Sequence, residues 1–259
     1  MAPLLSKNMS RLHRYWITLA SLLSLNECSL CGAALGLRAV PFCEQCTTAI
    51  TQPVAMVCRR CGYPLPEFDT TSRTCPNCAG RILYIDRTYP LFPLSREAQA
   101  LLHKVKFQAK AWLLESLLDH VTISLPLTIP ENNYDLILPV PLTFLRRWHR
   151  GFNQSEIIAR FLSRRMKALR LYRSILMRRE TLTAQSLLGR KERLTNVRLA
   201  FKIRNSQLVH NKRILLIDDV ITTGATANEC ARILKAAGAK MVSLVVLFRA
   251  MPQRNTITI

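Results

Sequence analysis

The stretch RILLIDDVITTGAT, residues 213–226, decides the fold of this chain. Its apolar start, 213–217, predicts a buried strand, and two acids, Asp218 and Asp219, follow directly. A threonine-rich turn then leads into a helix expected over 225–237, which Gly238 ends. A loop that leaves the carboxyl end of a strand and feeds a helix N-terminus is where an open α/β sheet binds anions.

The composition of this loop predicts a phosphate site beside a sugar site. Hydroxyl groups and backbone amides suit a phosphate, and the residues expected to supply them are Thr222, Thr223, Gly224, Ala225 and Thr226. The two acids would repel a phosphate, but their oxygens accept hydrogen bonds from the diol of a ribose. The alternative interpretation is a buried strand followed by an ordinary polar turn.

The rest of the chain alternates between strand and helix patterns. Strands are expected at 82–92, 135–139 and 240–248, and helices at 95–106, 111–121 and 153–169. Asn153, with Glu156 three residues later, has the spacing of a capping box at the start of the last helix. This alternation predicts an α/β domain with a parallel sheet and crossover helices.

Eight of the nine cysteines form four CxxC pairs within the first 80 residues. A two-residue spacer lets both thiolates of a pair face one metal ion, and a second pair completes a four-cysteine zinc site. Two structural zinc ions are therefore expected, held by Cys28, Cys31, Cys43, Cys46, Cys58, Cys61, Cys75 and Cys78. Disulfides, which need an oxidising compartment, and an iron–sulfur cluster are the alternatives.

The spacing does not decide which CxxC pairs share a metal. Consecutive pairing gives two zinc ribbons, 28–46 and 58–78, and interleaved pairing fits the sequence as well. Such ribbons either staple a segment too small to fold alone or bind nucleic acid. The ninth cysteine, Cys230, is expected to be a buried small hydrophobic residue.

Positive charge is concentrated in one part of the chain. The formal net charge is +21, and residues 136–213 carry 19 basic but only 3 acidic side chains. A localised excess indicates a polyanionic partner, the alternative being solvated helix faces rich in arginine. Phe144, Trp148 and Phe152 lie among these basic residues, where they either stack on the bases of single-stranded DNA or pack into the core.

The first 27 residues are interpreted as a short amphipathic helix or, alternatively, an irregular start of the chain. They include Lys7, Arg11 and Arg14 beside a short apolar patch, but no small-residue cleavage site that would indicate a signal peptide. No apolar run in the chain is long enough to span a membrane, so a cytoplasmic location is expected. The expected domains are this segment, a double zinc ribbon over 28–80 and a larger domain over 81–259.

The acid-pair stretch resembles the signature with which type I phosphoribosyltransferases bind phosphoribosyl pyrophosphate (PRPP). Over about residues 28–250 the chain resembles one branch of that superfamily, the ComF/GntX proteins linked to natural competence and use of external DNA. PVPLTFLRRWHRGFNQ, residues 139–154, is similar to a motif of this branch. Gln185, Arg193, Asn196 and Phe201 have its usual spacing.

The resemblance implies a type I phosphoribosyltransferase fold that binds PRPP with magnesium, the acid pair contacting the ribose. It implies a pyrophosphate loop at 141–151 with Arg146, Arg147, Arg150 and Gly151. It also implies a hood loop that contributes Gln185, Arg193 and Asn196, and it makes Asp218, Asp219, Arg178 and Arg179 the candidate catalytic residues. Glu180 and Leu182 depart from the branch, which usually has Arg and Thr there.

The implied function is phosphoribosyl transfer to an unidentified acceptor in the setting of DNA uptake or utilisation. Single-stranded DNA and proteins of the competence machinery are the implied partners. The alternative is a non-enzymatic protein that handles single-stranded DNA and keeps the PRPP site for regulation or structure.

The first testable prediction concerns metal content. Purified protein should contain about two zinc ions per chain, and a chelator should unfold the CxxC segments, because metal binding and folding are coupled in such sites. Elemental analysis, with circular dichroism before and after chelation, measures both. Zinc well below about one per chain, together with oxidised thiols in fresh lysate, would contradict the prediction.

Overall fold

The computed structural model describes residues 27–35, 40–54, 56–65, 75–121, 129–166, 169–179 and 200–251. The chain forms two compact units, residues 1–49 and 50–259. The first four CxxC cysteines belong to the smaller unit, where helix α2 (Glu44–Thr51) begins directly after Cys43. The other four belong to the larger unit, together with the α/β sheet.

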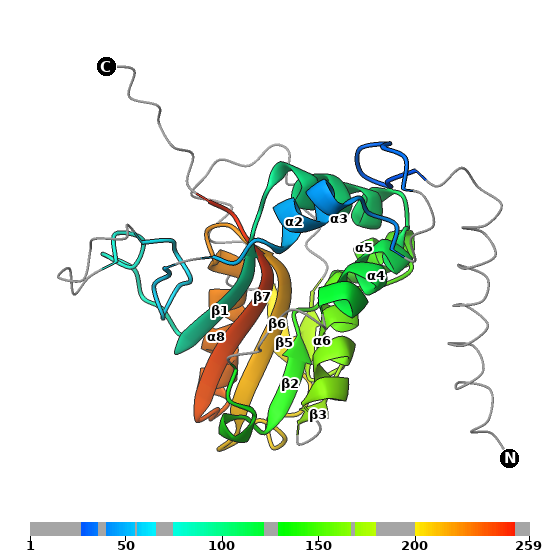
Figure 1. Cartoon of the computed structure of the whole chain (residues 1–259). Coiled ribbons are helices and arrows are strands. Elements are labelled where there is room, and N and C mark those ends of the chain that lie inside the picture. The colour runs from blue at the N-terminus through cyan, green and yellow to red at the C-terminus, as the bar shows by residue number, and fades with distance from the viewer. Residues whose placement is uncertain are drawn as a thin grey trace, which may run out of the picture. The chain divides into compact units, whose positions relative to one another are not determined.

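The larger unit is built on a five-stranded sheet in which every neighbouring pair is parallel (Figure 1). This confirms the parallel α/β architecture expected from the alternating pattern. In spatial order the strands are β1 (Arg87–Pro93), β7 (Met241–Arg249), β6 (Arg213–Ile221), β2 (Leu136–Pro139) and β3 (Arg170–Leu171).

Strand register brings four strand ends together at one edge of the sheet. Pro139, at the end of β2, pairs with Ile217, and the Val140 N–H donates to the Ile217 carbonyl oxygen at 2.8 Å. At the end of β7, Arg249 pairs with both Ile221 of β6 and Pro93 of β1. The segments that follow β1, β2, β6 and β7 therefore start from the same edge, where open α/β sheets bind their ligands.

Two crossover helices cover the sheet. Helix α6 (Gln154–Arg165) connects β2 to β3, and helix α8 (Ala225–Ala236) connects β6 to β7. The two connections run in opposite directions along the strand order, so right-handed crossovers place α6 and α8 on opposite faces. Helices α3 (Arg96–Phe107) and α4 (Ala111–Val121) follow β1 and pack on each other, and α4 also packs on α6.

The core lies between the sheet and these helices. Residues 214–217 of β6 and 244–248 of β7 are fully buried, as expected for parallel strands covered on both faces. Cys230, on the inner side of α8, is also fully buried, which confirms its interpretation as a small hydrophobic residue.

Several element boundaries differ from expectation. Strand β6 continues through the acid pair to Ile221, because pairing with β7 continues through Asp218 and Val220. The expected pyrophosphate loop contains a helix, α5 (Phe144–Arg150), and η1 (Glu131–Asn133) precedes β2. An antiparallel pair, β4 (Leu176–Arg178) with β5 (Phe201–Ile203), has no counterpart in the sequence-based prediction.

No helix among the described residues is both long and apolar enough to cross a membrane.

Candidate functional site

The acid pair is held by side chains from two other elements. Asp218 Oδ1 accepts hydrogen bonds from the Ser155 hydroxyl at 3.1 Å and from the Asp219 N–H at 2.9 Å. Asp219 Oδ2 forms an ion pair with Lys106 Nζ at 2.6 Å. Ser155 lies at the start of α6 and Lys106 in the last turn of α3, so the site joins three segments that are distant in sequence.

Sequence reasoning missed both of these partners. Ser155 comes directly after the motif at 139–154, and its place at a helix start beside a parallel strand end is the signal that could have found it. Lys106 carries no such signal, because nothing in a basic residue near a helix C-terminus indicates a partner in a distant strand.

The surroundings of the acid pair set its charge. Burial, and next the negative charge of Asp219, raise the pKa of Asp218 to about 7, although the Asp219 N–H, the Ser155 hydroxyl and the Lys106 charge act to lower it. Two carboxylates side by side resist full ionisation unless hydrogen-bond donors or cations compensate them. A ribose diol offers the donors that this pair needs.

The loop after β6 leads directly into the N-terminus of α8. Thr222 and Thr223 are exposed, and Gly224 has φ +78°, a left-handed conformation that favours glycine. Gly224 is the N-cap residue and has no side chain to cap the helix. The Ala225 N–H donates to the Thr223 hydroxyl oxygen at 3.4 Å. The first N–H groups of this 12-residue helix therefore lie beside the threonine-rich loop.

Helix α5 is bounded by Thr143 and Gly151. The Thr143 hydroxyl accepts from the Arg146 N–H at 3.3 Å, and Gly151 ends the helix with φ +77°. This capping explains why a helix stands where a loop was expected. The basic residues 146, 147 and 150 therefore project from a helix instead of an extended loop.

Two arginines of α5, Arg150 and Arg147, have different neighbours. Burial, and next the nearby Arg146 charge, lower the pKa of Arg150, while the negative charge of Asp219 acts to raise it. The Arg150 guanidinium lies 5.7 Å from the centre of the Phe107 ring. Arg150 therefore lies close enough to the acid pair for the Asp219 charge to act on its pKa. Arg147 forms an ion pair at 3.2 Å with Glu156, whose side chain is only 3% exposed.

Part of the expected hood loop lies outside the described residues. Arg178, on β4, lies 5.2 Å over the ring of Phe201, and the Arg179 N–H donates to the Ala200 carbonyl oxygen at 2.7 Å. Both arginines therefore lie at the end of the antiparallel β4–β5 pair. Outside the described residues are Glu180, Leu182, Gln185, Arg193 and Asn196.

The aromatic residues of the basic stretch are largely on the surface. Phe144 is 71% exposed and Trp148 78% exposed, so for these two the core-packing interpretation is wrong. Phe152 is half-buried. Two accessible rings on one short basic helix form a surface on which unpaired bases could stack.

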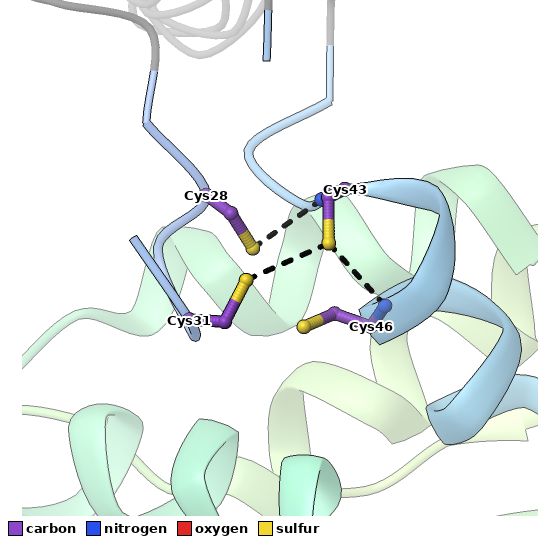
Figure 2. Close-up of side chains that lie close together, drawn as sticks. All are labelled: Cys28, Cys31, Cys43 and Cys46. Carbon is purple, nitrogen blue, oxygen red and sulfur yellow. Dashed lines mark hydrogen bonds between the residues drawn. The ribbon is translucent and has the colours of Figure 1, made fainter. Parts of the chain in front are cut away.

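The cysteines gather in two clusters made by consecutive CxxC pairs. Within each cluster the four sulfur atoms lie within 4.8 Å of one another. Figure 2 shows the first cluster, in which the Cys43 N–H donates to Cys28 Sγ at 3.3 Å and the Cys46 N–H to Cys43 Sγ at 3.5 Å. All nine cysteines are among the described residues, and none of them forms a disulfide.

The geometry of these clusters fits a tetrahedral zinc ion. A tetrahedron with Zn–S bonds near 2.3 Å has sulfur–sulfur edges of about 3.8 Å. The sulfur–sulfur distances are 3.6 Å for Cys31–Cys43 and 3.7 Å for both Cys58–Cys78 and Cys61–Cys75. Burial acts to raise the pKa of Cys28, but backbone N–H groups led by that of Cys43 bring it to about 6.

A cation is needed for four thiolates to coexist in either cluster. Burial, followed by the neighbouring cysteines, raises the pKa of Cys46 in one cluster and of Cys78 in the other. Zinc would be held by all four sulfurs of each cluster and would compensate their charge. Among the described residues only these two clusters bring three or more such ligand groups together, so the acid pair offers no metal cage of its own.

Comparison with known proteins places this architecture. Residues 138–257 match the family model of the phosphoribosyl transferase domain. DNA utilization protein YhgH of Salmonella typhi is 30% identical over 233 residues, which cover 86% of this chain and 97% of the relative. Competence protein F of Haemophilus influenzae is 28% identical over 232 residues, with the same coverage. Competence protein ComFC of Bacillus subtilis is 27% identical over 212 residues, or 80% of this chain and 84% of the relative.

The parallel sheet, the strand-end loop and the family match define a protein with a phosphoribosyl transferase domain, which confirms the expected type I phosphoribosyltransferase fold. Its N-terminal part adds two four-cysteine clusters. The chain belongs to the family of competence protein F and DNA utilization protein YhgH, as its resemblance to the ComF branch predicted.

The unusual pKa of Asp218 predicts a pH-dependent stability. A carboxyl group whose pKa is higher in the folded protein than in the unfolded chain stabilises the fold at low pH, and this contribution is lost as pH rises toward about 7. Asparagine does not ionise, so Asp218→Asn removes the loss of stability that ionisation of Asp218 causes. The variant should therefore gain stability relative to wild type between about pH 4.5 and about pH 8.

Urea denaturation at the two pH values measures the free energy of unfolding of both proteins. The difference between variant and wild type is compared, because pH effects of the cysteine clusters are common to both and cancel. Asp119→Asn, a change at an exposed position of α4, is the control and should follow wild type. Equal pH dependence of wild type and Asp218→Asn would show that Asp218 has an ordinary pKa.

Proposed function

We propose that the chain binds PRPP with magnesium at the edge where β6, β2 and β7 end, and transfers its phosphoribosyl group. The observation that carries this proposal is the adjacency of the acid pair in β6 to the open N-terminus of α8. One side suits the ribose diol, and the other suits the 5′-phosphate. The family match to the phosphoribosyl transferase domain supports it.

The proposed reaction places opposite charges at the two ends of the breaking bond. The bond between the ribose anomeric carbon and pyrophosphate breaks, a bond to the acceptor forms at that carbon, and the acceptor loses a proton. Positive charge develops on the ribose, where Asp218 and Asp219 stabilise it, while negative charge builds on the departing pyrophosphate. Arg150 and Lys106, both near Asp219, are the described cations best placed to meet that charge.

Magnesium enters this scheme as part of the PRPP complex, where it neutralises pyrophosphate oxygens. We assign Arg146 to the same pyrophosphate side, and Arg178 and Arg179 to the base of the hood that closes over it. Arg147 contributes less in this arrangement, because its guanidinium is already paired with Glu156. The acceptor nucleophile is not assigned.

We further propose a role in DNA uptake or utilisation in the cytoplasm, with competence-machinery proteins as partners. The names of the relatives, competence protein F and DNA utilization protein YhgH, support this setting. Two clusters of reduced cysteines, with zinc as their expected ion, suit a reducing compartment.

Removing the two acids tests the PRPP site. Asp218→Asn with Asp219→Asn should weaken Mg·PRPP binding at least about tenfold, since each charge-assisted hydrogen bond is typically worth about 1.5–3 kcal/mol. Isothermal titration calorimetry measures the affinity. Glu115→Gln with Asp119→Asn removes the same charge from the exposed face of α4 and should bind like wild type. No heat with the wild type, or equal affinity for the acid-pair variant, would refute the site.

A second candidate function, binding of single-stranded DNA, is favoured by the exposed rings on α5. Phe144 and Trp148 stand among arginines on a helix in the most basic part of the chain. Arginines hold the phosphate backbone, and aromatic rings stack on bases without sequence preference. This function is compatible with PRPP binding and would give the non-enzymatic alternative its activity.

The DNA proposal predicts steep salt dependence and a specific loss on removing the rings. Affinity should fall by roughly 0.7 log unit per log unit of salt for each phosphate neutralised. Phe144→Ala with Trp148→Ala should weaken binding about tenfold or more, since each stacked base is worth about 1–3 kcal/mol. Fluorescence anisotropy with a labelled oligonucleotide measures both effects. Ile82→Ala, at another exposed apolar position, is the control, and absence of binding at low salt would contradict the proposal.

A further inference from the structure

Arg249, at the end of β7, forms hydrogen bonds to the backbone where loop 222–226 begins. Arg249 is only 1% exposed. Its Nη1 donates to the carbonyl oxygens of Ile221, at 3.2 Å, and of Thr222. Both carbonyls belong to the chain that leads from β6 into the loop, so the guanidinium fixes the peptide groups from which the loop departs.

The same guanidinium contacts the segment that carries the second cysteine cluster, Cys58, Cys61, Cys75 and Cys78, which we call the second four-cysteine segment. It lies 5.6 Å from the centre of the Tyr63 ring. Tyr63 follows Cys61 and Gly62, and its carbonyl oxygen accepts from the Cys58 N–H at 2.8 Å, which makes it part of the metal-binding turn. Burial lowers the pKa of Arg249, while the negative charge of Cys61 acts to raise it. Among the described residues no carboxylate forms an ion pair with Arg249.

A second arginine makes the next contact along the loop. Arg81 follows Cys78 by three residues, and its Nη2 donates to the Thr223 carbonyl oxygen at 2.6 Å. Its Nη1 donates to the Asn77 side-chain oxygen at 3.2 Å, and its N–H to the Cys78 carbonyl oxygen at 3.1 Å. The carbonyl groups of 221, 222 and 223 are therefore all held by arginines that belong to, or pack on, this four-cysteine segment.

The four-cysteine segment is in turn fixed to the sheet. The Thr88 N–H of β1 donates to the Arg59 carbonyl oxygen at 2.8 Å, and the Thr88 hydroxyl donates to the Arg60 carbonyl oxygen at 2.8 Å. Packing is tight here, because a Cβ atom at Gly62 would lie 2.9 Å from Thr88 Cγ2. The position of this segment against β1 is therefore fixed, and so are its contacts to the loop after β6.

We propose that Arg249 and Arg81 are positioning residues for the 5′-phosphate, and that the metal-bound Cys58–Cys78 cluster holds them in place. Orienting the carbonyls of 221–223 sets the direction of the N–H groups that follow at the start of α8, which would contact the phosphate. Metal binding orders such a turn, and its loss releases the turn. The inference rests on the proposed PRPP site, but its mechanical part can be measured without any ligand.

Arg81→Met is the principal test, because Arg81 is only partly buried and its loss spares the core. Calorimetry should show affinity for ribose 5-phosphate and for Mg·PRPP falling by the same factor, about tenfold, with affinity for magnesium pyrophosphate unchanged. A merely destabilised protein would lose all three equally. Arg59→Met keeps the backbone contact to Thr88 on the same segment and should bind all three like wild type.

Amide hydrogen exchange supplies the readout that needs no ligand. Exchange at residues 222–226 should speed up in Arg81→Met, and also in Cys58→Ser, whose zinc content should fall by about one per chain. Arg249→Met should show the same effect where it folds. If wild type fails to bind PRPP, the proposed function is wrong, while the exchange data still decide the link. Unchanged exchange in both Arg81→Met and Cys58→Ser, or unchanged ribose 5-phosphate affinity in Arg81→Met, would overturn the inference.

Discussion

Parallel pairing of β6 with β2 on one side and β7 on the other is the constraint on which the site depends. It fixes Pro139 beside Ile217 and Arg249 beside Ile221. The segments that carry the acids, the basic helix and the buried arginine therefore start from one edge. The fully buried residues 214–217 keep this register, since a slip would expose apolar side chains and bury polar ones.

The acidic side chains in and near the site are paired with neighbouring basic side chains. Asp219 has Lys106, and buried Glu156 is shared by Arg147, Arg160 and Arg173 at 3.1–3.3 Å. The second group joins α5 to α6 and to the chain after β3. With three guanidinium groups around one carboxylate, this group still carries a net positive charge.

The sequence predicted what depends on local pattern. The parallel sheet, the strand–turn–helix order at 213–226 and the CxxC cysteines as candidate metal ligands follow from periodicity or spacing, but spacing left open which CxxC pairs share a cluster. Gly224 follows from the conformation that the turn requires. The sequence could not predict contacts between segments far apart in the chain. Ser155 with Asp218, Lys106 with Asp219 and Arg249 with Tyr63 arise only when the strands are in register. The helix at 144–150 was also missed, because the basic motif hid its caps, Thr143 and Gly151.

In the PRPP site that we propose, the ion pair between Lys106 and Asp219 would favour ligands that carry a negative charge of their own. A neutral sugar that took the hydrogen bonds of Asp219 would leave the Lys106 ammonium, which is only 24% exposed, without its counter-ion. A sugar bearing an anionic group next to the bound hydroxyls would let the ammonium exchange one negative partner for another. In the PRPP site that we propose, this contact would therefore act against free pentoses and nucleosides, which bring no anionic group to Lys106.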